Sequence, residues 1–283
     1  MTTSQTLAFS QVDVFASASF QGNPVAVVHN ADYLSDDAMA AFARWTNLSE
    51  TTFLLQPTAA VADYRLRIFT PGGELPFAGH PTLGSCHAWL EAGGRAKSTE
   101  YVLQECAAGL IRIRTSAGRL AFAAPPLLRT GPIGAETLNA LSGALGLANE
   151  HVVGHQWVDN GPGWCALMLD SAERVLSVIP NFQQLAGVNV GLVGPYASTA
   201  ECDFEVRAFV PDLGVPEDPV TGSLNAGIAQ WLMTAGLAPD NYVASQGTAV
   251  KRAGRVYLDR ENGDIWVGGD VCVRLRGEAR FDV

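Results

Sequence analysis

The stretch "HPTLGS" at residues 80–85 occurs a second time in altered form, as "DPVTGS" at residues 218–223, 138 residues further along the chain. A second pair precedes it in both places: "RIFTP" at residues 67–71 is followed 140 residues later by "RAFVP" at residues 207–211. Similar segments that recur in one order at one distance indicate a duplicated unit. The sequence therefore predicts two halves of similar fold.

A third, looser repeat agrees with this division, since the glycine-led strand pattern that starts at Gly22 returns at Gly161. Between the halves lies the proline-rich stretch "AAPPLLRTGPIG" at residues 123–134, which is typical of a linker. We expect an N-terminal half at residues 1–124 with a central helix at 81–92, and a C-terminal half at residues 125–283 with a central helix at 219–235. Whether the last strand packs back on the first half stays open.

Strand and helix patterns alternate along the chain, which predicts a mixed α/β (α+β) fold. The stretch "SDDAMAAFARW" at residues 35–45 predicts a helix, with Ser35 as its N-cap and two acidic residues in its first turn. With 283 residues, of which 48% are hydrophobic and 16% charged, the chain is long enough to bury a core in each half.

Charge and cysteine content exclude several classes of partner. A formal net charge of −10 argues against binding to nucleic acid or to an anionic membrane, because both favour basic surfaces. The five cysteines form no CxxC pair, as expected of reduced thiols. No signal peptide and no apolar run of membrane-spanning length are present, so we expect a cytoplasmic protein.

Cofactor and metal signatures are also weak. The two lysines, Lys97 and Lys251, lie in polar segments, whereas pyridoxal phosphate chemistry needs a lysine in an apolar pocket. No glycine-rich nucleotide loop follows a strand. His151 and His155 would share one face of a strand, without a third ligand nearby. We therefore expect neither a cofactor nor a metal.

The two repeated hexapeptides place His80 and Asp218 in equivalent positions, each directly before a proline. Because proline is favoured at the first helical position, both residues are predicted N-caps, with Gly84-Ser85 and Gly222-Ser223 in the first turns. Helix N-termini attract anions, so the two starts would suit a small carboxylate if the halves face one another. Asp218 is also an ordinary cap residue, whereas histidine is a poor cap that can titrate near neutrality.

Five segments together resemble the PhzF-type phenazine biosynthesis family, in order and over almost the whole chain. They are "FQGNPVAVV", "NLSETTFLL", "RIFTPGGELPFAGHPTLGS", "PEDPVTGSLNAGIAQWL" and "SQGTAVKRAGRVYL". The resemblance implies a diaminopimelate-epimerase-like fold of two pseudo-symmetric halves, each a curved and mostly antiparallel sheet wrapped round a central helix. It further implies an active site between the halves and a homodimer.

The resemblance also assigns roles to residues. It implies that Glu50, His80 and Asp218 are catalytic and that Glu50 moves a proton between substrate carbons, although Glu50 alone would be interpreted as a surface acid in a turn. Apolar walls, for which Phe53 and Phe77 are candidates, would raise the pKa of such a carboxyl. The substrate-binding residues would be Gly79, Gly222 and Ser223, the two glycines letting backbone N–H groups approach a carboxylate.

The sequence thus predicts a cofactor-independent isomerase that acts on a small, carboxylated, cyclic or unsaturated metabolite. A thiol-based racemase is disfavoured, because no cysteine stands at the start of either central helix. Two alternatives remain. One is a non-catalytic homologue that binds a small molecule. The other is a hydrolase that joins Ser223 or Ser85 to His80 and Asp218, although neither serine lies in a GxSxG elbow.

Overall fold

The computed structural model describes residues 4–211 and 216–282 and divides the chain into two compact units. Unit 1 holds residues 1–123 and 268–283, and unit 2 holds residues 124–267. The segment after residue 267 therefore packs with the first unit. The predicted division between residues 124 and 125 had left the place of the last strand open. In chain order, unit 2 is an insertion within unit 1.

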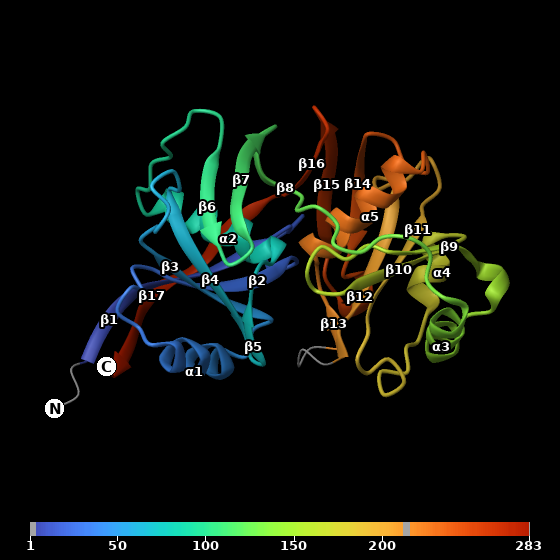
Figure 1. The fold of residues 1–283 in the computed structure, drawn as a ribbon, viewed down its shortest axis with the longest axis horizontal. Helices are drawn as coiled ribbons and strands as arrows, with labels where there is room; N and C mark the ends of the chain where they lie inside the picture. Colours follow the sequence, from blue (N-terminus) through green and yellow to red (C-terminus); the bar gives the residue numbers. More distant parts are fainter. Residues whose placement is uncertain (1–3, 212–215, 283) are drawn as a thin grey trace. The chain divides into compact units, whose positions relative to one another are not determined.

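Unit 1 is a sheet with two helices. Its elements are β1 (Ser4–Val14), β2 (Asn23–Val28), α1 (Asp36–Thr46), β3 (Glu50–Leu55), β4 (Tyr64–Thr70), β5 (Gly73–Leu75), α2 (Gly79–Glu91), β6 (Val102–Cys106), β7 (Gly109–Ser116), β8 (Arg119–Ala123) and β17 (Val271–Asp282). Neighbouring strands pair antiparallel, except that β2–β3 and β4–β6 are parallel. Strand β17 runs beside β1 over their whole length, so the first and last strands lie together (Figure 1).

Unit 2 repeats this order of pairing. Its elements are α3 (Ala135–Leu145), the short helix η1 (Asn149–His151), β9 (Val152–Trp157), β10 (Trp164–Leu169), α4 (Ala172–Ser177), β11 (Asn189–Pro195), β12 (Phe204–Phe209), β13 (Glu217–Asp218), α5 (Gly222–Thr234), β14 (Asn241–Gln246), the short helix η3 (Thr248–Val250), β15 (Gly254–Glu261) and β16 (Asp264–Gly269, which ends in unit 1). Here the parallel pairs are β10–β11 and β12–β14, at the same places in the order. The repeated topology is what duplication predicts.

A central helix packs against the sheet of each unit. In unit 1, α2 contacts β1, β2, β3, β4, β6, β8 and β17, and a side chain at Gly84 would overlap the Val25 side chain of β2. In unit 2, α5 comes equally close to the chain between β9 and β10, because a side chain at Gly227 would overlap the Val158 carbonyl. Only glycine permits these approaches.

No helix among the described residues is long and apolar enough to span a membrane.

The starts of the central helices differ from the prediction. The N-caps are Ala78 and Thr221, and neither side chain makes a capping hydrogen bond. His80 is the second residue of α2, whereas Asp218 lies in β13, where it pairs with Ala208 of β12. Neither predicted cap is therefore a cap.

The reason for the difference is local. Pro81 is accommodated as the third residue of α2, because the first helical N–H groups have no partner within the helix. Helix α2 therefore begins five residues before Gly84, which places Gly84 and Ser85 in its second turn. Strand pairing keeps Asp218 extended, so α5 begins only at Gly222.

Candidate active site

Glu50 is the first residue of β3 and is 9% exposed. Side chains alternate along a strand, so Glu50 and Thr52 share a face. The Thr52 hydroxyl lies 2.8 Å from the hydroxyl of Ser85 on α2, which identifies this face as the one toward the central helix. Phe53 points the other way, into the cluster around α1, so its predicted role as a wall beside Glu50 is wrong.

His80 is the residue that the fold brings to Glu50. The His80 Nε2 and Glu50 Oε2 atoms lie 3.3 Å apart, and the His80 side chain is 3% exposed. The other ring nitrogen, Nδ1, lies within hydrogen-bond distance of the Asn23 side-chain amide nitrogen, at 3.2 Å. The Asn23 carbonyl accepts in turn from the Ser49 hydroxyl, at 3.2 Å. Side chains from β2, β3 and the preceding turn thus fix the imidazole.

Burial and these contacts set the charge of His80. The ring hydrogen-bonds the Asn23 side chain and the backbone of Pro24, whose carbonyl can only accept. Burial lowers the pKa of His80 to about 3, opposed only in part by a hydrogen bond with the Pro24 backbone. The ring is therefore neutral near pH 7, and the expectation that it titrates near neutrality is wrong.

Gly79 opens α2 directly before His80. The first hydrogen bond of the helix runs from the Thr82 N–H to the Ala78 carbonyl, so the N–H groups of Gly79 and His80 precede the helical ladder. Such groups bind anions well. Unit 1 therefore brings a buried carboxylate and a neutral imidazole together in space at the start of a helix.

In unit 2, Asp218 is 8% exposed and accepts a hydrogen bond of 2.6 Å at Oδ2 from the Thr221 hydroxyl. Gly222 and Ser223 are the first two residues of α5. The Ser223 hydroxyl accepts from the Trp164 indole N–H at 3.0 Å, which leaves its own proton available to donate. Unit 2 thus also combines a carboxylate with a helix start.

Within unit 1, the hydrolase triad is not assembled. The Ser85 hydroxyl is paired with Thr52, while the His80 nitrogens face Asn23 and Glu50. Among the described residues, no group of three or more potential metal ligands occurs.

Several residues that contact the predicted site residues were missed from the sequence. They are Asn23, Ser49, Thr221 and Gln246, whose side-chain amide donates to the Asp218 carbonyl at 3.1 Å. Each lies inside or beside one of the five quoted segments, yet buried amides and hydroxyls carry no signal of their contacts in a single sequence.

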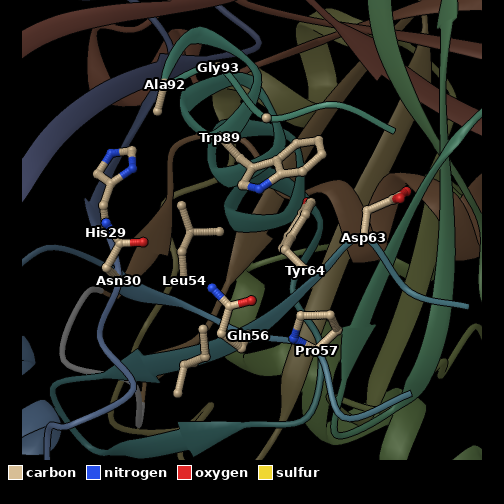
Figure 2. A pocket seen from close by; sticks show the side chains of 12 residues that line it. His29, Asn30, Leu54, Gln56, Pro57, Asp63, Tyr64, Trp89, Ala92 and Gly93 are labelled. Carbon is tan, nitrogen blue, oxygen red and sulfur yellow. The ribbon is translucent and has the colours of Figure 1, made fainter. Parts of the chain in front are cut away.

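A separate hollow of about 250 Å³ lies at the far end of α2 (Figure 2). Figure 2 shows Trp89 and Tyr64 on one side of it and His29 on the other. Trp89 belongs to the last turn of α2, whereas His80 belongs to the first. None of the predicted site residues lines this hollow.

Known proteins are similar to this chain over nearly its full length. A family model described as phenazine biosynthesis-like protein, PhzC-PhzF, matches residues 12–281. "Antisense-enhancing sequence 1" of Schizosaccharomyces pombe is 37% identical over 96% of this chain and 95% of its own. The trans-2,3-dihydro-3-hydroxyanthranilate isomerase of Pseudomonas aeruginosa is 32% identical over 88% of this chain and 89% of its own.

Among solved structures, a PhzF family protein of Enterococcus faecalis matches with a TM-score of 0.79 and 26% identity. The match covers 97% of this chain and 99% of that one. Together with the repeated strand order in the two units, it confirms the predicted fold class.

Proposed function

The chain is an isomerase of the phenazine biosynthesis-like PhzC-PhzF family, and we propose that it moves a proton between carbon atoms of a small carboxylated metabolite. Glu50 is the general acid/base of this reaction. It takes a proton from one carbon and delivers a proton to another, so that substrate and product differ only in the position of a hydrogen and a double bond. The substrate is neither oxidised nor reduced overall.

The observation that carries the proposal is the pairing of Glu50 with a neutral His80 at 3.3 Å. With a pKa of about 3, His80 does not hold an extra proton near pH 7. The proton removed from carbon therefore passes to the Glu50 carboxyl, where it exchanges with solvent before Glu50 protonates the other carbon, as a one-base reaction allows. The neutral ring of His80 lies against the Glu50 carboxylate and so helps to hold it in place.

The remaining predicted residues bind and orient the substrate. Asp218 and the Ser223 hydroxyl supply an acceptor and a donor, and the helix starts at Gly79 and Gly222 supply backbone N–H groups for a carboxylate. The name of the Pseudomonas aeruginosa relative suggests a substrate class, an unsaturated ring that bears a carboxylate and an amine. The homodimer stays a prediction, which light scattering of the purified protein can check.

Solvent-deuterium incorporation tests the proposal. The protein is incubated in D₂O with trans-2,3-dihydro-3-hydroxyanthranilate and a panel of cyclic and amino-acid carboxylates, and each compound is followed by mass spectrometry. We expect uptake of one deuteron into one member of the panel. Glu50→Gln should abolish this uptake and still bind the compound, because the amide keeps the shape but cannot take the proton.

Glu100→Gln is the matched control, since Glu100 lies on the exposed surface of the same unit. Uptake that survives Glu50→Gln would refute the role of Glu50. Binding without uptake in the wild type would instead support the non-catalytic alternative.

A further inference from the structure

The segment "SQGTAVKRAGRVYL" at residues 245–258 contributes none of the predicted site residues, yet it holds the loop that carries one of them. Gln246 ends β14 and is fully buried. Its Oε1 accepts from the Thr221 backbone N–H at 3.0 Å and from the Asn225 side chain at 2.8 Å. Its Nε2 donates to the Asp218 carbonyl at 3.1 Å and to the Thr221 hydroxyl at 2.9 Å. The amide of Gln246 is thereby fully used.

Two glycines of the same segment press against the loop at residues 218–221. A side-chain carbon at Gly247 would lie 2.7 Å from the Pro219 carbonyl oxygen, and Gly247 also has a φ of +97° that favours glycine. A side chain at Gly254 would overlap the Val220 side chain. We name Gln246, Gly247 and Gly254 the clamp. The clamp meets every residue of the 218–221 loop.

The direction of the hydrogen bonds shows what the clamp does for Asp218. The Thr221 hydroxyl has one proton, and it already accepts from the Gln246 amide. Its own proton therefore points to Asp218 Oδ2, 2.6 Å away. Gln246 thus fixes both the backbone of Asp218 and, through Thr221, the orientation of its carboxylate.

We propose that Gln246 is the positioning residue for Asp218, acting through the hydroxyl of Thr221. The structural part stands on the contacts of unit 2 alone, whereas its effect on turnover rests on the proposed function. Without the Gln246 amide protons, the Thr221 hydroxyl turns away, and its hydrogen bond to the Asp218 carboxylate is lost.

Unit 1 offers a matched control. Gln104 of β6 is equally buried, and β6 pairs in parallel with β4 as β14 pairs with β12. Gln104 accepts from the Tyr64 hydroxyl at 3.0 Å and donates to the Thr82 hydroxyl at 3.1 Å. Neither partner is a carboxylate. The same substitution at Gln104 therefore perturbs a buried amide without touching Asp218.

Gln246→Glu keeps the acceptor oxygen and removes the two donated bonds, so the new carboxylate attracts the Thr221 proton away from Asp218. We expect kcat for deuteron uptake to fall about tenfold to a hundredfold, as for a misplaced catalytic group, while Gln104→Glu stays within about threefold of wild type. Thr221→Val removes the hydroxyl with little change of shape and should cause a similar fall. The double variant should be no slower than either single one, because both act through one hydrogen bond.

Crystal structures of wild type, Gln246→Glu and Thr221→Val provide a readout independent of turnover. We expect the Asp218 carboxylate to rotate away from its wild-type position in both variants and to stay in place in Gln104→Glu. An unmoved carboxylate, or additive losses of kcat, would overturn the inference. If the wild type incorporates no deuterium but the carboxylate moves as expected, the proposed function fails and the positioning role stands.

Discussion

Replacing Arg207 by methionine should lower the free energy of unfolding by about 3–5 kcal/mol, the cost of leaving one member of a buried ion pair alone. Arg207 lies on β12 and binds Glu217 of β13 through two hydrogen bonds, of 2.9 and 2.8 Å. The side chains are 5% and 9% exposed. A third nitrogen donates to the carbonyls of Val175 and Val178 at the end of α4. Methionine fills a similar volume but supplies none of these bonds.

Arg67 of β4 is the matched control. It forms the same two-pronged pair with Glu74 of β5, at 2.7 Å for both bonds, but the side chains are 18% and 36% exposed. Water can solvate Glu74 once the guanidinium is gone, so Arg67→Met should cost no more than about 1 kcal/mol. The topology and the two-pronged pairing are shared. The third nitrogen of Arg67 pairs with the exposed carboxylate of Asp36, which water can also solvate once the guanidinium is gone.

Urea denaturation at pH 7, followed by circular dichroism and by tryptophan fluorescence, measures both variants against wild type. The reasoning requires the Arg207 variant to lose at least about 2 kcal/mol more than the Arg67 variant. Equal losses would show that burial does not control the strength of these pairs. A loss below about 1 kcal/mol for Arg207→Met would show that Glu217 finds other partners when the arginine is absent.

Two further outcomes follow from the packing. Because the pKa of His80 is about 3 in the folded protein and near 6.5 in the unfolded chain, the unfolded state binds more protons between these values, and stability falls as the pH drops. The wild-type stability minus that of His80→Asn should decline by up to about 1.4 kcal/mol per unit between pH 6 and 4 in denaturation series, and a flat difference would contradict the burial of a neutral ring. Gly227→Ala should destabilise the folded protein by about 1–3 kcal/mol or more, because the new side chain overlaps the Val158 carbonyl. Gly143→Ala in α3 should instead stabilise it by about 0.5–1 kcal/mol, because a side chain there meets nothing within 4 Å. Calorimetry that gives both changes one sign would refute this contrast.

Local signals in the sequence were sufficient where a single residue determines the structure. Ser35 is the N-cap of α1 as predicted, and its hydroxyl accepts from the Ala38 N–H. The repeats at residues 67 and 207 predicted the duplication because both arginines anchor the fifth strand of their unit. Glu50 was identified only through family resemblance, because nothing in "NLSETTF" shows that the strand buries it.

The errors arose where tertiary contacts override local preference. His80 and Asp218 stand at matching places in the sequence, but strand pairing with Ala208 holds only the second of them extended. Gln246 could not be found from its own segment, since its four hydrogen bonds reach three residues that lie more than twenty positions away in sequence. Phe53 was misplaced because the side-chain alternation of β3 fixes its direction only once the strand is known to start at Glu50.

The pairing of β17 with β1 has a consequence for the order in which the chain folds during synthesis. Unit 2 is continuous and leaves the ribosome before β17, so it can complete its sheet while unit 1 still lacks a strand that pairs along all of β1. Helix α2, which carries His80, contacts β17, so it reaches its final surroundings only after β17 has been translated. A ribosome-bound chain that stops before residue 271 should bury unit 2 and leave β1 open to other strands.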